Sequence, residues 1–172
     1  MSEAPATSRP LVIGVGSDDR SDDGVGLDVA RALRERPQLG ADVIEGPGDL
    51  TRLLDAWDGR TFVVLVDAVR SGAAPGTIRR WERDEASQLP SETAVSTHGF
   101  SLPDVLQLAR DLHRLPARLV VFGIEAQETG PGNVRSPPVR AAVETACHWI
   151  ASELTVGPRG VPRGPGGART NA

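Results

Sequence analysis

Short apolar segments alternate along this chain with segments in which apolar residues recur at helical spacing. Three of the apolar segments, 11–15, 62–66 and 119–124, contain no charged or hydrogen-bonding side chain, which is typical of strands covered on both faces of a parallel sheet. The segments between them have the period of amphipathic helices. The alternation predicts an α/β fold: a three-layer α/β/α sandwich around a mostly parallel five-stranded sheet with one antiparallel edge strand.

The expected elements follow in the order β-α-β-α-β-β-α-β-α. Strands are expected at 11–15, 41–45, 62–66, 77–81 and 119–124, and helices at 23–36, 50–57, 101–113 and from 136 onward. The connection 68–76 is shorter than the dozen or so residues of a parallel crossover, so we expect the third and fourth strands to form an antiparallel pair at a sheet edge. The domain is expected to span 10–155, between a disordered N-terminus, 1–9, and a disordered Gly/Pro/Arg-rich tail, 156–172.

Composition excludes several classes of site. Among 172 residues there is one cysteine, Cys147, three histidines, and 19 basic residues that are all arginine. These counts exclude a cysteine-rich zinc or iron–sulfur site, a Schiff-base lysine and a Walker-type phosphate lysine, so a metal must use Asp, Glu or His. The net charge of −4 argues against nucleic acid. Without a leader or an apolar run of about 18 residues, we expect no membrane contact and a cytoplasmic protein.

The loop after the first expected strand is rich in acids. Residues 14–26 begin with G-x-G, like a dinucleotide-binding loop, but then contain four aspartates, Asp18, Asp19, Asp22 and Asp23. These charges would repel a pyrophosphate, so nucleotide binding is disfavoured. Helix capping explains one or two of the acids. The glycines of the D-D-G-x-G segment suggest close approach of another backbone or of a large partner.

Two further residues are expected near this loop. Asp67 directly follows the expected strand 62–66, and His98 precedes the expected helix 101–113. Ligands in open α/β sheets bind at the carboxyl ends of the strands, so we expect Asp23, Asp67 and His98 to meet on one rim. Two carboxylates and one imidazole suit nickel, zinc, iron or manganese and are too few for a closed structural site.

The G-x-G-S…D-D-G-x-G loop, the aspartate after the third strand and the S-T-H segment before a helix resemble the hydrogenase maturation endopeptidases. The resemblance implies an aspartyl-type endopeptidase that removes the C-terminal extension of a [NiFe] hydrogenase large-subunit precursor. It also implies that Asp23, Asp67 and His98 bind the nickel already inserted in the substrate, with no metal permanently bound. The family often has Glu where this chain has Asp23, so Asp22 could compete as ligand.

The chain has no signature of a serine or cysteine nucleophile or of a zinc protease, so hydrolysis needs an activated water. Asp22 and Glu125, just after the last expected strand, are candidate bases. Three alternatives stay open. The first is a non-cleaving hydrogenase accessory protein or chaperone that uses the same acidic rim; the others are a different hydrolase and a nucleotide-binding domain. We expect a monomer.

Overall fold

The structure, a computed structural model, describes residues 9–90 and 99–156. Its centre is a five-stranded sheet of order β2-β1-β3-β5-β4. The strands are β1 Leu11–Gly14, β2 Asp42–Glu45, β3 Phe62–Val69, β4 Ile78–Glu82 and β5 Arg118–Glu125. All neighbouring pairs are parallel except β4 and β5. The predicted mostly parallel sheet with one antiparallel edge strand is therefore confirmed.

The partner of the edge strand differs from the prediction. β4 pairs with β5, for example Trp81 with Val121, and β5 lies between β3 and β4. The expectation that the third and fourth strands form a pair was wrong. The physical reason lies in β5, whose residues are buried from Leu119 onward, whereas every residue of β4 except Trp81 is exposed or partly exposed. The more apolar strand is stabilised by a neighbour on both sides, and the strand with polar residues takes the edge.

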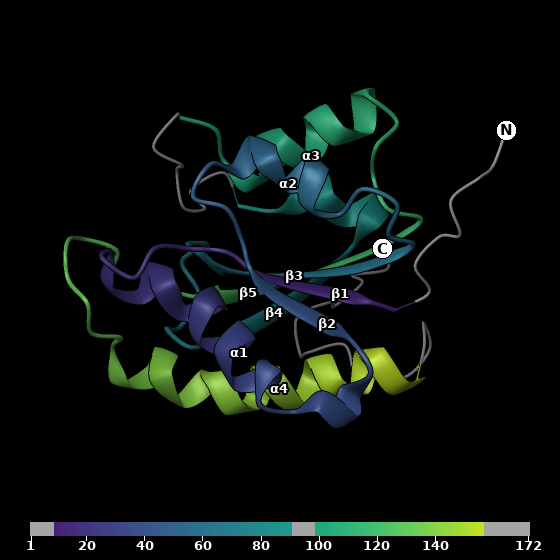
Figure 1. Ribbon diagram of the computed structural model, residues 1–172. Helices are drawn as coiled ribbons and strands as arrows, with labels where there is room; N and C mark the ends of the chain where they lie inside the picture. The colour runs from purple at the N-terminus through teal and green to yellow at the C-terminus, as the bar shows by residue number, and fades with distance from the viewer. Residues whose placement is uncertain (1–8, 91–98, 157–172) are drawn as a thin grey trace, which may run out of the picture.

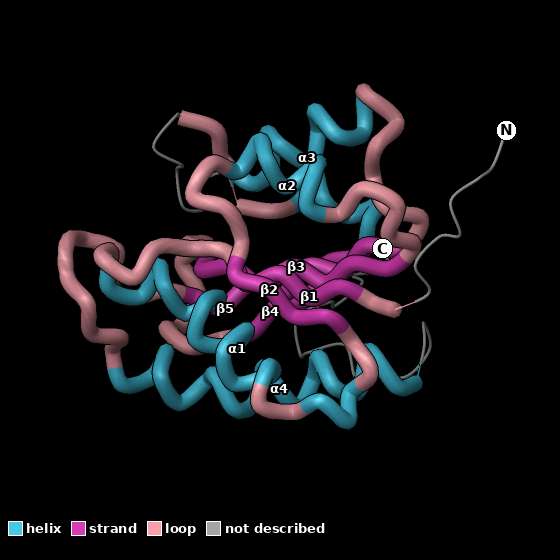
Figure 2. Tube along the Cα trace, in the orientation of Figure 1, coloured by secondary structure: helices cyan, strands magenta, loops and turns pink. Residues whose placement is uncertain are grey.

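Helices cover both faces of the sheet (Figures 1 and 2). On one face lie α1 Val25–Arg34 and α4 Pro137–Val156; on the other lie α2 Leu53–Ala56 and α3 Leu102–Asp111. Two hydrophobic clusters fill the spaces between the layers, one on each face. Short 3-10 helices, η1 Ser21–Gly24, η2 Pro37–Leu39, η3 Leu50–Arg52 and η4 Arg83–Gln88, complete the connections. The three-layer architecture is thus confirmed.

Local capping signals explain where two of these helices begin. Ser101 and Asp104 form a capping box at the start of α3, with the Ser101 backbone N–H donating to Asp104 at 2.9 Å. The Asp49 carboxylate accepts the backbone N–H of Thr51 at 3.0 Å and so caps η3, which runs into α2. These hydrogen bonds satisfy N–H groups that a helix start leaves free.

The predicted disordered ends, 1–9 and 156–172, lie almost wholly outside the described residues; α4 includes Val156. Within the described part of the chain, we find no helix with the length and apolar character that crossing a membrane requires.

Candidate active site

Asp67 lies within β3, whereas the sequence prediction placed it just after the end of the strand. β3 continues to Val69, and Asp67 pairs with Gly123 of β5. The Asp67 side chain is fully buried, at 0% exposure. Neither of its carboxylate oxygens has a hydrogen-bond partner among the described residues. A buried carboxylate without partners is costly, so the arrangement suggests a site completed by a ligand.

Burial raises the pKa of Asp67 well above its ordinary value, and the neighbouring charge of Asp23 raises it further. The backbone N–H of Ala68 lies near enough to lower the pKa slightly, although it does not reach hydrogen-bond geometry. Asp67 is therefore stabilised in its protonated form unless a cation lies beside it.

Asp23 is the second buried carboxylate of the site. It lies in η1, at the end of the first loop, and is 3% exposed. Burial raises the pKa of Asp23, whereas the charges of Arg20 and Arg135 and the backbone N–H of Ser17 lower it. Two adjacent buried carboxylates that repel each other are the donor set that a divalent cation stabilises. The chemistry of Asp23 and Asp67 therefore fits the predicted metal-binding role.

Asp22 has a different role from its neighbour, although sequence alone could not separate them. It is 0% exposed and accepts hydrogen bonds from the backbone N–H groups of Gln127 and Glu128, each at 2.9 Å, and from the N–H and hydroxyl of Ser136, at 2.6 and 2.8 Å. Burial alone would raise the pKa of Asp22, but these bonds lower it. Both oxygens are occupied, so the structure disfavours Asp22 as competing ligand or base.

The remaining loop acids do not join the site. Asp18 binds Arg31 at 2.6 Å and Arg135 at 2.7 Å, and Asp19 is exposed. The four aspartates therefore differ: Asp18 belongs to a surface ion-pair network, Asp19 is exposed, Asp22 anchors the loop, and Asp23 lies in the candidate site.

The glycines of this loop pack against the chain itself. A Cβ on Gly24 would lie 2.1 Å from the guanidinium of Arg135, and a Cβ on Gly26 would lie 2.2 Å from the carbonyl oxygen of Val15. The expected close approach of another backbone is confirmed for Gly26, where α1 contacts the sheet. For Gly24 the neighbour is the Arg135 side chain, and neither glycine shows room for a substrate backbone.

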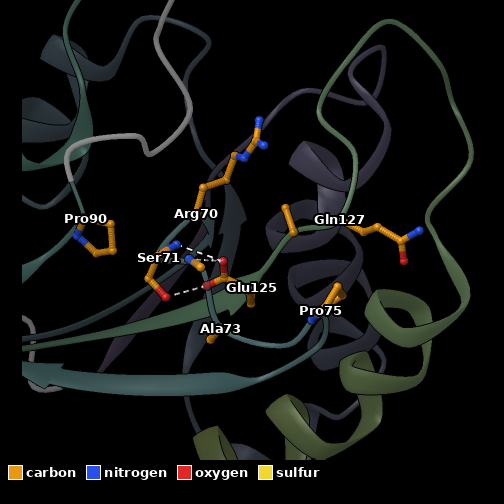
Figure 3. A pocket seen from close by; sticks show the side chains of 9 residues that line it. Arg70, Ser71, Ala73, Pro75, Pro90, Glu125 and Gln127 are labelled. Carbon is orange, nitrogen blue, oxygen red and sulfur yellow. Dashed lines mark hydrogen bonds between the residues drawn. The ribbon is translucent and has the colours of Figure 1, made fainter.

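Glu125, the other candidate base, supports a turn. It is 3% exposed, and its carboxylate accepts from the Ser71 N–H and hydroxyl, at 2.8 and 2.7 Å, and from the Gly72 N–H at 3.0 Å (Figure 3). These bonds hold the 70–76 connection against the end of β5. Nothing in the local sequence indicated this role, because the donors lie more than 50 residues earlier in the chain.

The third predicted ligand, His98, lies outside the described residues. Within the ranges that the structure covers, no group of three His, Cys, Asp or Glu side chains could hold a metal ion. Asp23 and Asp67 are thus brought together as predicted, and the contribution of His98 stays a prediction.

Comparison with known proteins identifies the family. The family model described as hydrogenase maturation protease matches residues 27–153. This chain belongs to the hydrogenase maturation protease family. The resemblance inferred from the acidic loop is confirmed, and the chain is a peptidase that acts in hydrogenase maturation.

Individual relatives cover most of the chain. Hydrogenase 2 maturation protease of Escherichia coli (strain K12) is 29% identical over 159 residues, covering 90% of this chain and 96% of that protein. Among solved structures, the hydrogenase maturating endopeptidase HybD from E. coli is 26% identical with a TM-score of 0.72, covering 87% of this chain and 94% of its own. The [NiFe] hydrogenase maturation protease HybD from Thermococcus kodakarensis is 30% identical with a TM-score of 0.67, covering 85% and 98%.

Proposed function

We propose that this protease removes the C-terminal extension of a [NiFe] hydrogenase large-subunit precursor after nickel insertion. We further propose that Asp23, Asp67 and His98 bind the nickel of that substrate. One observation carries the proposal: Asp67 is fully buried beside Asp23 and has no hydrogen-bond partner within the described residues. A substrate that brings its own cation would compensate this charge at the moment of recognition.

The chemistry follows from the donor set. Two carboxylates with raised pKa values release protons when a cation binds between them. The bound nickel polarises the scissile carbonyl or the attacking water. Asp22 and Glu125 are held by hydrogen bonds. Because both predicted candidate bases are occupied in this way, we propose that Asp23 or Asp67, once deprotonated, accepts the proton of the water in addition to holding the cation.

The test is to incubate nickel-loaded and nickel-free precursor with the protease and to follow the loss of the C-terminal extension by mass spectrometry. We expect the wild type to cleave only the loaded form. Asp23→Asn, Asp67→Asn and His98→Ala should each slow trimming at least about 100-fold, because each removes one ligand. Asp19→Asn, which changes an exposed acid of the same loop, is the matched control and should trim normally. Full trimming by all three ligand variants would exclude the metal-binding role.

The non-cleaving alternative makes a different prediction in the same assay. An accessory protein would bind the precursor and leave the extension in place, whereas the family membership favours cleavage. That the enzyme is a cytoplasmic monomer is part of the proposal, and cell fractionation and light scattering would test it.

A further inference from the structure

A cavity of about 580 Å³ lies beyond Asp67, where β3 and β5 end. Its walls are the 70–76 connection and the 125–127 segment, with Pro90 at its border (Figure 3). The volume lies within the range of sites that hold small ligands or short peptide segments. None of the described residues that line this cavity belongs to the proposed nickel site.

Among the described residues of the lining, Arg70 is the one arginine. Its guanidinium is exposed, points away from Glu125 in Figure 3, and contacts the Thr129 hydroxyl at 3.4 Å. Among the described residues it forms no ion pair with a carboxylate, whereas Arg31, Arg80 and Arg135 each bind at least two. Arg70 can therefore bind an anionic group of another molecule.

Glu125, the other charged residue of the lining, forms no ion pair with Arg70 among the described contacts. Both oxygens of Glu125 are turned into the wall and accept hydrogen bonds from Ser71 and Gly72 (Figure 3). The cavity thus combines a wall held rigid by a buried acid with one exposed guanidinium at its edge.

The position of Arg70 in the chain gives its approximate distance from the proposed cleavage site. Arg70 follows Asp67 by three positions, and β3 is extended to Val69. At about 3.3 Å per residue, the two backbones are roughly 10 Å apart, which is also the length of about three residues of extended peptide. A substrate that is held at Asp67 and follows the end of β3 would reach Arg70 about three residues from the cleaved bond.

We propose that Arg70 determines substrate specificity by binding a carboxylate of the precursor about three residues from the scissile bond, while the cavity holds the adjoining peptide. This inference rests on the proposed function. An arginine binds a carboxylate through charge-assisted hydrogen bonds, which can be bidentate. The carboxylate comes either from an Asp or Glu side chain near the cleavage point or from the C-terminus of the extension.

The experiment measures KM and kcat for nickel-loaded precursor with wild type, Arg70→Gln and Arg70→Glu. We expect KM to rise about tenfold for Arg70→Gln, and more for Arg70→Glu, with kcat nearly unchanged, because the lost contact is present in both ground and transition states. Arg52→Gln is the matched control, because Arg52 is exposed on η3 and does not line the cavity.

Substrate variants identify the carboxylate. Neutralising the right Asp or Glu of the precursor should raise KM for wild type but not for Arg70→Gln, and replacing it by Arg should restore cleavage by Arg70→Glu. If only shortening of the extension has this effect, the terminal carboxylate is the ligand.

Three outcomes would count against the inference, and they are distinguishable. If wild type cleaves no precursor, the proposed function fails. If wild type cleaves but Arg70→Gln has an unchanged KM, the specificity role is wrong. If Arg70→Gln raises KM but no change in the precursor restores cleavage by Arg70→Glu, Arg70 does not bind a carboxylate of the substrate, and the proposal is overturned.

Discussion

At the scale of single residues, the buried carboxyl group of Asp67 destabilises the fold but is suited to binding a cation in the proposed site. Burial and the nearby Asp23 raise the pKa of Asp67 above its ordinary 3.8. Between that value and the raised pKa, the folded protein holds a proton that the unfolded chain releases, so the free energy of unfolding falls as pH rises. In the metal-free protein, Asp67→Asn should therefore increase stability at pH 7 by about 1 kcal/mol or more, or about 2–4 °C in Tm.

Thermal unfolding from pH 4 to pH 8 checks this prediction. The difference between Asp67→Asn and wild type should grow with pH and then level off. Asp19→Asn should follow the wild type, because Asp19 is exposed. A variant less stable than wild type throughout this range would show that the Asp67 charge does not destabilise the fold.

At the scale of elements, Asp22 joins the first loop to the β5–α4 connection. Its carboxylate accepts from Gln127, Glu128 and Ser136, and Arg135 binds the Ser21 carbonyl at 2.9 Å from the same connection. Asp22→Ala should cost about 3 kcal/mol of stability, because three backbone N–H groups lose their acceptor. It should also release Asp23 from its position. Hydrogen exchange of these three amides should become faster than in wild type.

Two variants separate anchoring from general damage. Asp22→Asn keeps one acceptor oxygen and should retain part of the protection, whereas Ser136→Ala loses only the hydroxyl donor and should stay close to wild type. Equal exchange rates in Asp22→Ala and wild type would show that the two loops hold together without this carboxylate.

At the scale of the whole molecule, a buried charge cluster joins the helical layer to the sheet. Glu153 of α4 is 1% exposed and binds Arg80 of β4 at 2.9 Å and Arg118 of β5. Glu153→Ala should lower the free energy of unfolding by about 3 kcal/mol, because two arginines lose a buried partner. Urea unfolding measures this loss. Glu153→Gln should recover part of it, and trimming by the folded fraction should be unchanged, since Arg118 lies at the opposite end of β5 from the site.

The layers and the element order could be predicted because their signals are local. Apolar strands, helical periodicity and the Ser101–Asp104 capping box depend on residues close together in the chain. The neighbour of β4 could not be predicted, because the order of strands in a sheet depends on which long-range pairings bury the most apolar surface. β4 ends at Glu82 and β5 begins only at Arg118, after η4 and α3, so this pairing is not a local one.

The sequence by itself determined the fold class and the acidic loop, and it predicted that Asp23 and Asp67 lie near each other. Only the tertiary structure decided which carboxylate does what. Asp22 and Asp23 are chemically identical and adjacent, and they differ because one meets donors more than 100 residues away while the other meets Asp67. In the unfolded chain, water surrounds every aspartate in the same way. In the folded protein, the groups that replace this water set the pKa and the role of each carboxylate.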